Sequence, residues 1–254
     1  MIPAERQRII LSMLEDKEIC TIGELTDKLA VSHMTVRRDI AKLEEKGRVF
    51  SVAGGVQRIE SVREEQNHKT KSTQNLEIKL ALGRACMPMV APQATVYLDA
   101  GTTTLEIARA IAHREDILVI TNDLFIADYL AEHGTCEYYL TGGRIDRGNH
   151  SCIGDMAASF ISRLNVDVAF VSATCWDRRG VSSPSEGKVM VKKALAAVAK
   201  QSILVSDSSK FGRTGTFLGM ESHEFDMIIT DEHLPQNYKE LLLQLDVELV
   251  EVQP

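Results

Sequence analysis

The sequence has no C-x-x-C pair and no H-E-x-x-H motif, so it lacks the residue spacings that most often bind zinc. Its five cysteines (Cys20, Cys86, Cys136, Cys152 and Cys175) are odd in number and far apart, which predicts reduced thiols. No apolar run approaches the length of a membrane span, and the first residues show no signal-peptide pattern. We therefore expect a cytoplasmic protein with no metal, no other cofactor and no membrane partner.

Charge is unevenly distributed along the 254 residues. The net charge of −7 disfavours a nucleic-acid partner for the chain as a whole, because phosphates repel an acidic surface. Residues 33–58, however, carry six basic side chains against three acidic ones, and the acidic surplus lies beyond residue 60. Such a segment is suited to DNA if oligomerisation brings two or more copies onto one duplex.

The most informative segment runs from Ser32 to Gly47. Ser32 stands where a helix N-cap is expected, and Gly47 ends the pattern as a C′ residue. An apolar stripe of Val36, Ile40 and Leu43 faces a core, while the opposite side is basic. A helix of this kind fits the DNA major groove. The residues predicted to contact DNA are Ser32, His33, Met34, Thr35, Arg37, Arg38, Lys42 and Arg48.

The flanking segments complete a winged helix-turn-helix. Thr21 and Glu24 have capping-box spacing, which predicts a helix over 22–29. Residues 30–32 would form the turn, and 5–16 an earlier helix. Strands over 48–52 and 56–59, joined by a Gly-Gly turn, would form the wing. The alternative is three packed helices whose arginines are only a solvated face.

The rest of the chain predicts a second domain. Residues 61–74 are mostly polar and indicate a linker between domains at 1–60 and 75–254. Short apolar runs typical of buried strands span 95–98, 117–121, 138–141, 166–172, 202–205 and 227–230, with a further candidate at 248–252. Helical stretches span 76–89, 104–112, 124–132, 156–164, 188–199 and 236–245. This alternation predicts an α/β domain with a mostly parallel sheet covered by helices on both faces.

Ligands of open α/β sheets bind at the carboxyl ends of the strands, so the residues that follow each strand are the candidates. After the first strand, Asp99 is followed by Gly101 and three threonines, Thr102, Thr103 and Thr104, which lead into a helix. Glycine allows close approach of the backbone, and helical N–H groups with hydroxyls suit a phosphate. The alternative is that the threonines only cap the helix.

Other strand ends carry related residues. Asn122 follows the second strand, Gly142, Gly143 and Arg144 follow the third, and Asp207 and Lys210 follow the fifth. Each group alone is a weak signal, but together they would form a pocket for a phosphorylated polyol. Trp176, the only tryptophan, either lines this pocket or packs in the core.

Taken together, these motifs resemble the DeoR family of bacterial transcription regulators. The resemblance covers almost the whole chain and is most specific at 35–39, 99–103, 140–143 and 207–211. It implies a winged helix joined to an effector domain like that of ribose-5-phosphate isomerases, and repression of sugar-catabolic operons in response to a phosphorylated sugar. It also implies that Gly101 to Thr104 hold the phosphate, while Asp99, Asn122, Asp207 and Lys210 line the pocket.

Two departures from the family pattern stand out. The wing reads Ser51-Val-Ala-Gly-Gly55 where the family commonly has Arg-Thr-His-Gly-Gly, so the wing's contribution to DNA contact is in doubt. Glu186-Gly-Lys188 occupies a stretch where the family often has a carboxylate. Either Glu186 supplies that carboxylate from a shifted position, or Lys188 reflects a more acidic ligand.

The sequence thus predicts a homo-oligomeric repressor, a dimer or tetramer, that binds a double-stranded DNA operator and releases it on binding a phosphorylated sugar or sugar acid. One alternative is a sugar-phosphate isomerase carrying a DNA-binding domain, with Asp99 or Glu186 as the base. Another is an α/β domain that has lost its ligand and serves only for oligomerisation.

Overall fold

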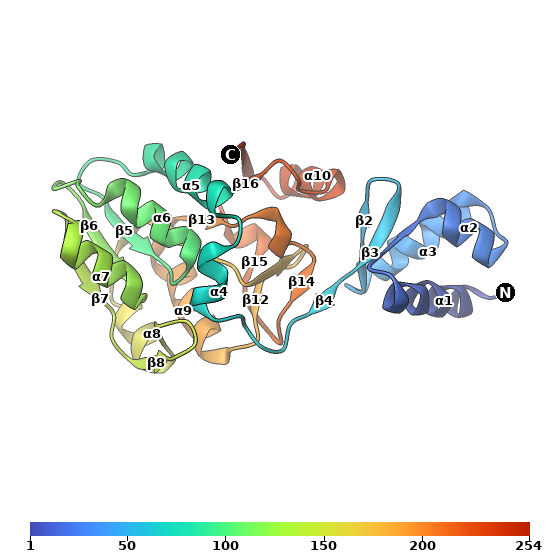
Figure 1. Ribbon diagram of the computed structural model, residues 1–254, viewed down its shortest axis with the longest axis horizontal. Coiled ribbons are helices and arrows are strands. Elements are labelled where there is room, and N and C mark those ends of the chain that lie inside the picture. Colours follow the sequence, from blue (N-terminus) through green and yellow to red (C-terminus); the bar gives the residue numbers. More distant parts are fainter.

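The first 58 residues fold into three helices and a small antiparallel sheet, in a computed structural model that describes residues 1–254 (Figure 1). The helices are α1 (Pro3–Asp16), α2 (Ile22–Leu29) and α3 (His33–Glu45). The strands are β1 (Ile19–Thr21), β2 (Val49–Val52) and β3 (Gly55–Arg58), in the order β1-β3-β2. This is the predicted winged helix, with β1 as an additional strand that the sequence analysis did not identify.

The local signals in the sequence set the ends of these helices. Thr21 and Glu24 form a reciprocal capping box at α2, and the Ser32 hydroxyl accepts the Thr35 N–H at the start of α3. Gly47 has a φ of +61°, a left-handed conformation that glycine adopts without the steric cost of a Cβ. Val36, Ile40 and Leu43 are buried in one core with residues of α1 and α2, which confirms the predicted stripe.

The larger domain is built on seven parallel strands, in the order β17-β16-β13-β10-β5-β6-β7. Their bounds are β5 Thr95–Leu98, β6 Leu118–Thr121, β7 Glu137–Leu140, β10 Val166–Val171, β13 Ala199–Val205, β16 Met227–Asp231 and β17 Glu248–Val252. The helices are α5 Leu76–Cys86, α6 Thr102–Ile111, α7 Leu124–His133, α8 Asp155–Ile161, α9 Glu186–Val198 and α10 Gln236–Gln244. The α/β class is therefore confirmed.

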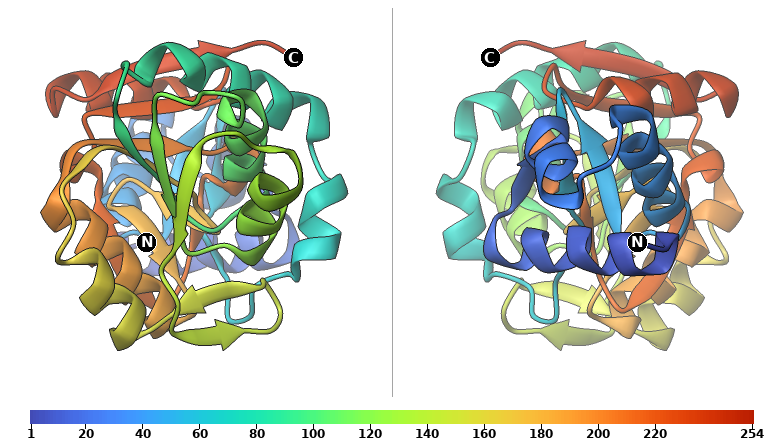
Figure 2. Two further views of the ribbon diagram at one scale, coloured as in Figure 1. Left: turned by 90° about the vertical axis from the view of Figure 1, so that its left-hand side faces the viewer. Right: turned by 90° about the vertical axis from the view of Figure 1, so that its right-hand side faces the viewer.

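Helices cover both faces of this sheet, as Figures 1 and 2 show. Val96 and Phe170 lie in one core with Ile107 of α6, on the face that α5, α6 and α7 cover. Tyr97, the next residue along β5, lies in a second core with Leu195 of α9, on the face that α8 and α9 cover. Successive side chains of each strand thus alternate between two cores, and both faces are apolar. No helix of the structure is long and apolar enough to cross a membrane.

Smaller strands, which the sequence analysis did not predict, surround the main sheet. An antiparallel sheet contains β11 (Cys175–Asp177), β12 (Gly180–Ser183) and β15 (Phe217–Glu221), and β8 (Arg144–Asp146) pairs with β9 (Ser151–Ile153). Short 3-10 helices lie at Met87–Met89, Ser208–Lys210 and Ser222–Glu224. These elements are three to five residues long, which gives little periodicity to recognise in a sequence.

The segment between the two domains is held against the larger one. Its first part, β4 (Glu60–Ser61), pairs with β14 (Arg213–Thr214), and its second part forms α4 (His68–Thr73). Phe50 of the wing also packs on Phe211, with ring centroids 5.4 Å apart. The two domains therefore share a hydrophobic cluster, although they form separate lobes in Figure 1.

The order of the strands reverses between β5 and β10, which are neighbours in the main sheet. From β5 the chain proceeds through β6 to β7 in one direction, and from β10 it proceeds through β13 and β16 to β17 in the other. Helices on either side of such a reversal diverge and leave a crevice at the carboxyl ends of the two strands. The residues that follow β5 and β10 are therefore the candidates for a ligand-binding site.

Candidate DNA-binding face and effector pocket

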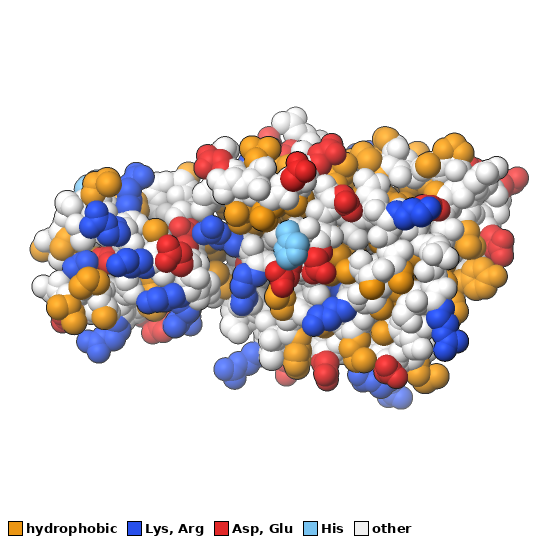
Figure 3. Space-filling view, turned by 180° about the vertical axis from the view of Figure 1, so that it is seen from behind, with side chains coloured by type: hydrophobic (Ala, Val, Ile, Leu, Met, Phe, Trp, Pro, Cys, Tyr) orange, Lys and Arg blue, Asp and Glu red, His pale blue; other side chains and the backbone are white.

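The outer face of α3 is exposed and basic. Arg37, Arg38 and Lys42 are exposed there, and Arg48 is exposed just after the helix. None of these four side chains forms an ion pair within the chain, so their charges are free for a partner. Figure 3 shows Lys and Arg side chains spread over this lobe. The face thus combines positive charge with a helix of the dimensions that a major groove accepts.

The remaining predicted DNA contacts lie at the start of α3. Ser32, His33 and Met34 are exposed, and Met34 keeps 68% of its surface accessible. Thr35 is half-buried, and its hydroxyl lies 3.0 Å from that of Ser32. Behind the helix, Asp39 is buried and accepts the Arg6 guanidinium at 2.5 Å. This ion pair, which the sequence analysis missed, fixes α3 to α1 and holds the exposed face in place.

The tip of the wing lies beside the larger domain. Ser51, Val52 and Ala53 line a hollow of about 500 Å³ together with residues 232–237, just before and within the start of α10. Glu44, at the end of α3, accepts both the Ser51 N–H and the Asn237 amide. Ser51, Val52 and Ala53 are therefore close to the larger domain, and none of them is basic.

At the crevice between β5 and β10, the carboxylate of Asp99 is buried, and its Oδ2 atom makes three polar contacts. It accepts the Ser172 N–H at 3.1 Å and the Ser172 hydroxyl at 3.0 Å, and it pairs with the ammonium group of Lys192. Lys192 also donates to the Ser172 carbonyl at 2.6 Å. These three residues line a small cavity of about 20 Å³, here called the switch-point cavity.

The loop after β5 is held rigidly by residues of the neighbouring strand. Asn122 accepts the Ala100 N–H and Asp123 the Gly101 N–H, each at 3.0 Å. A Cβ on Gly101 would lie 2.8 Å from that of Ser172, so only glycine fits between the two strand ends. Burial raises the pKa of Asp123 to about 6, although the N–H groups that it accepts act in the opposite direction.

The three threonines after Gly101 form the first turn of α6 and are buried. Thr104 donates its hydroxyl to the Asp99 carbonyl at 2.6 Å and to the Gly101 carbonyl at 2.9 Å, so its role is structural. No side chain caps the N-terminus of α6, which leaves its first N–H groups without a side-chain acceptor. Thr102 and Thr103 stand at this uncapped end.

A second cavity of about 140 Å³, here called the lysine cavity, lies beside the first and shares Thr174 with it. Lys210 lines it and pairs with Asp207 at 3.3 Å, while Asn75 donates to Asp207 at 3.0 Å. Burial would raise the pKa of Asp207, but the nearby Lys210 and three hydrogen bonds outweigh burial and lower it. Lys79 also lines this cavity, and burial lowers its pKa to about 8.

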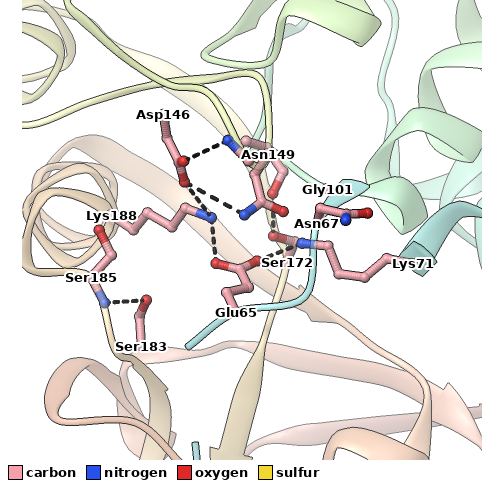
Figure 4. Close-up of polar contacts among 12 residues, drawn as sticks. Glu65, Asn67, Lys71, Gly101, Asp146, Asn149, Ser172, Ser183, Ser185 and Lys188 are labelled. Carbon is pink, nitrogen blue, oxygen red and sulfur yellow. Dashed lines mark hydrogen bonds and ion pairs between the residues drawn. The ribbon is translucent and has the colours of Figure 1, made fainter. Parts of the chain in front are cut away.

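Glu65, in the segment between the domains, lies between two lysines at the mouth of the switch-point cavity (Figure 4). Its carboxylate pairs with the ammonium groups of Lys71 and Lys188, and Lys188 also reaches Asp146 at 3.3 Å. The side chains of these two lysines and of Glu65 are at most 16% exposed. Burial would raise the pKa of Glu65, but the two lysines outweigh it and lower the pKa to about 2.

The structure thus brings together part of the predicted effector pocket. Asp99 and Asn122 line the switch-point cavity, and Asp207 and Lys210 line the adjoining one. Neither cavity is lined by Gly101 to Thr104 or by Gly142 to Arg144. Gly143 packs against Ala157, and the Arg144 guanidinium lies beside Gly187. Gly142 and Gly143 follow β7 at the edge of the sheet, and Arg144 begins β8, whose Asp146 pairs with Lys188 of the switch-point cavity.

Two alternatives that the sequence left open are resolved. Trp176 is completely buried in a cluster with Phe211 and Tyr238 and lines neither cavity, so it packs in the core. Lys188 lines the switch-point cavity, whereas Glu186 is exposed at the start of α9.

Several residues of these cavities escaped sequence reasoning, among them Glu65, Lys71, Lys79 and Lys192. Two of them had a recognisable signal. Lys79 lies on the stripe of α5 that also contains Leu82 and Cys86, so the signal was a charged residue among apolar neighbours. Lys192 is one helical turn beyond Lys188 and therefore shares its face. Glu65 and Lys71 had no such signal, because their segment is polar throughout.

Family comparisons cover both domains. Residues 6–62 match the DeoR-like helix-turn-helix domain, and residues 74–232 match the DeoR C terminal sensor domain. The chain is 46% identical over 250 residues to the protein described as "Uncharacterized HTH-type transcriptional regulator YgbI" of Escherichia coli strain K12, and 98% of each chain is covered. It is 30% identical over 250 residues to the HTH-type transcriptional repressor GlcR of Bacillus subtilis strain 168, which covers 98% of this chain and 96% of the relative.

Among solved structures, ribose 5-phosphate isomerase A of Methanocaldococcus jannaschii aligns with 54% of this chain and 55% of its own, at 16% sequence identity and a TM-score of 0.40. The aligned part is therefore about half of either chain.

Proposed function

The chain belongs to the DeoR family of transcriptional regulators, and on this basis we propose that it represses a carbohydrate-catabolic operon and leaves its operator when a phosphorylated sugar or sugar acid binds. One observation carries the proposal. A basic, ion-pair-free helix face in one domain is joined, through an ordered segment, to a cluster of buried charges at the strand ends of the other.

In this proposal the outer face of α3 enters the major groove of double-stranded DNA. Arg37 and Arg38 reach base edges or phosphates, while Lys42 and Arg48 contact the backbone. Ser32, His33, Met34 and Thr35 lie at the end of the helix that approaches the groove first. The repressing direction is supported by the Bacillus relative, which is named a repressor.

The effector, in turn, places its phosphate at the uncapped N-terminus of α6. There, Thr102 and Thr103 add hydroxyl donors to the backbone N–H groups, and Gly101 lets the ligand approach. Lys210 supplies a cation, and Asp99, Asn122 and Asp207 contribute acceptors for sugar hydroxyls. Gly142, Gly143 and Arg144 would take part only if the β8–β9 hairpin moved toward the crevice.

We propose a regulator rather than an enzyme. An isomerase needs a carboxylate base free to reach the C2 proton of a sugar. Glu186 is exposed and outside the cavities, and Asp99 already pairs with the Lys192 ammonium group and accepts hydrogen bonds from Ser172. Two relatives that are 46% and 45% identical are named transcriptional regulators, which supports this interpretation.

The test begins with DNA fragments selected from the source genome by binding to the purified protein. Phosphorylated sugars and sugar acids are then screened for release of that DNA and for a rise in melting temperature. A ligand at 100 times its Kd adds about 2.7 kcal/mol of stability to the folded state. Turnover of any ligand would favour the enzyme, and binding of DNA without any ligand response would favour a domain used only for oligomerisation.

We further propose that the protein acts as a homo-oligomer, a dimer or tetramer. Residues 1–60 are neutral overall, so one copy has little net positive charge with which to bind DNA phosphates. Two copies on an inverted repeat double those contacts, with half-sites spaced by whole helical turns. Sedimentation at micromolar concentration should show no dominant monomer, and a monomer protecting one asymmetric site would contradict the proposal.

A further inference from the structure

The carboxylate of Glu65 has the environment of a bound ligand. It lies between the ammonium groups of Lys71 and Lys188, and only 9% of its side chain is exposed. It comes from the segment between the domains, whereas Lys188 comes from α9, 123 residues further along the chain. Figure 4 shows the carboxylate pointing into the space between the two lysines, and Ser172 lines the same cavity.

We propose that Lys71 and Lys188 form a subsite for the carboxylate of a phosphorylated sugar acid, and that Glu65 occupies this subsite until the effector displaces it. The proposal rests on the function proposed above and narrows its effector class. It also explains the size of the switch-point cavity: about 20 Å³ holds one water molecule, so no sugar fits while Glu65 is in place.

The charges around the subsite favour an anion over a neutral sugar end. If Glu65 leaves, Lys71 has no other ion-pair partner, and Lys188 keeps only Asp146 at 3.3 Å. Two poorly compensated and largely buried ammonium groups are costly, so a second anion must replace the first. A carboxylate has the same shape and charge as the group that is bound there now. The phosphate of the same ligand would remain at α6, as proposed above.

A neighbouring hydrogen-bond acceptor, the side-chain oxygen of Asn149, has no partner and suits a hydroxyl of such a ligand. Asn149 is 6% exposed, and its side-chain oxygen has no hydrogen-bond partner, while its amide nitrogen lies 3.5 Å from Asp146. Because Asp146 also pairs with Lys188, this oxygen is close to the subsite. A sugar hydroxyl is the donor that it lacks.

Displacement of Glu65 would also act on the DNA-binding domain. Four residues before Glu65, Ser61 belongs to β4, and β4 follows the wing strand β3 directly. A ligand that expels Glu65 therefore releases the part of the chain that positions the winged helix. Displacement of Glu65 would therefore couple effector binding directly to the position of the winged helix.

The experiment compares matched pairs of ligands by calorimetry. Each pair has one carbon number: erythronate 4-phosphate with erythrose 4-phosphate, ribonate 5-phosphate with ribose 5-phosphate, and 6-phosphogluconate with glucose 6-phosphate. The full-length protein should bind at least one acid about tenfold to a hundredfold more tightly than its aldose partner. Lys188→Gln should abolish that preference, and Glu65→Gln should tighten binding of the acid, because the internal competitor has lost its charge.

Two exposed residues give matched controls: Lys193→Gln on α9 and Glu77→Gln on α5 should leave both affinities unchanged. If Glu65→Gln does not fold, the acid preference of the wild type against Lys188→Gln still decides the question. Equal binding of acids and aldoses by the wild type, with release of DNA, would overturn the subsite and leave the regulator intact. Binding of neither class would overturn both, and looser binding of the acid by Glu65→Gln would overturn the competition.

Discussion

Both domains gather cations, but in opposite physical states. On α3 the arginines are exposed and have no ion-pair partner. At the strand ends of the larger domain, Lys192 and Lys188 are largely buried, and each is paired with a carboxylate. An exposed cation costs the fold little and attracts a polyanion from a distance, at the expense of salt sensitivity. A buried ammonium group is tolerated only when a counter-charge is present, so its state depends on whether a particular anion is bound.

This difference predicts that equivalent substitutions will have different consequences. Removing a cation from α3 should lower DNA affinity and leave stability unchanged. Removing one from the crevice should destabilise the larger domain, because it leaves a buried carboxylate without its partner. The following substitutions test that contrast, from the largest expected effect to the smallest.

Lys192→Met should have the largest effect on stability. The substitution leaves the buried Asp99 carboxylate without its cation, and the side chains of the pair are only 7% and 5% exposed. We expect the free energy of unfolding to fall by about 3–5 kcal/mol. Denaturant titration followed by the fluorescence of Trp176, which is buried in the larger domain, measures this value.

Two further variants make this measurement specific. Lys193→Met changes the exposed neighbour on the same helix and should alter stability by no more than about 0.5 kcal/mol. Asp99→Asn combined with Lys192→Met removes both charges and should restore part of the loss. If Lys192→Met were as stable as the wild type, the buried ion pair would contribute no more to the free energy of unfolding than a surface cation does.

Thr103→Val should weaken effector binding. Valine keeps the shape of this buried threonine at the start of α6 and removes the hydroxyl donor. A hydrogen bond to a charged phosphate contributes about 1.5–3 kcal/mol, so calorimetry should show that amount of lost affinity. Binding of DNA without effector should be unchanged, and in cells the target genes should stay repressed in the presence of inducer. Normal affinity would mean that Thr103 only caps the helix.

Arg38→Ala should weaken DNA binding by about 1–3 kcal/mol if this arginine contacts a guanine, and should leave the melting temperature unchanged. Gel-shift titrations at several salt concentrations then separate the two kinds of contact. Loss of a phosphate contact reduces the salt slope by about one, whereas loss of a base contact reduces sequence preference. Arg84→Ala, an exposed arginine on α5 of the other domain, is the matched control. Full operator binding by Arg38→Ala would exclude this side chain from the interface.

The two regions also differ in how far the sequence predicted them. The winged helix depends on short-range signals, such as the Thr21–Glu24 capping box, the Ser32 cap and the stripe of α3, and the structure confirms each of them. The seven strands of the main sheet were predicted to within two residues at most ends, because continuous apolar runs are a strong signal.

The pocket depends instead on long-range pairing, which a sequence does not reveal. Glu65 meets Lys188 across 123 positions, and Lys192 meets Asp99 across 93. The end of β7 was grouped with the other strand ends, because the order of strands in the sheet, which places β7 at the edge, could not be determined from the sequence. Asp99, Asp207 and Lys210 were predicted for the pocket, and the Asp207–Lys210 pair is local, but Lys192, the counter-ion of Asp99, depended on the folded arrangement.

Lys79 gives the smallest effect and a direct measure of how a buried lysine differs from an exposed one. Burial lowers its pKa to about 8, whereas the unfolded chain keeps the ordinary value of about 10.4. Above pH 8 the unfolded state therefore binds more protons than the folded state, and the stability of the wild type should rise with pH relative to Lys79→Met. Because water partly screens the group, we expect at most about 1 kcal/mol between pH 8 and pH 9. Lys69→Met, at an exposed position of α4, should show no such trend. Parallel pH profiles for the wild type and Lys79→Met would mean that Lys79 titrates like a surface lysine.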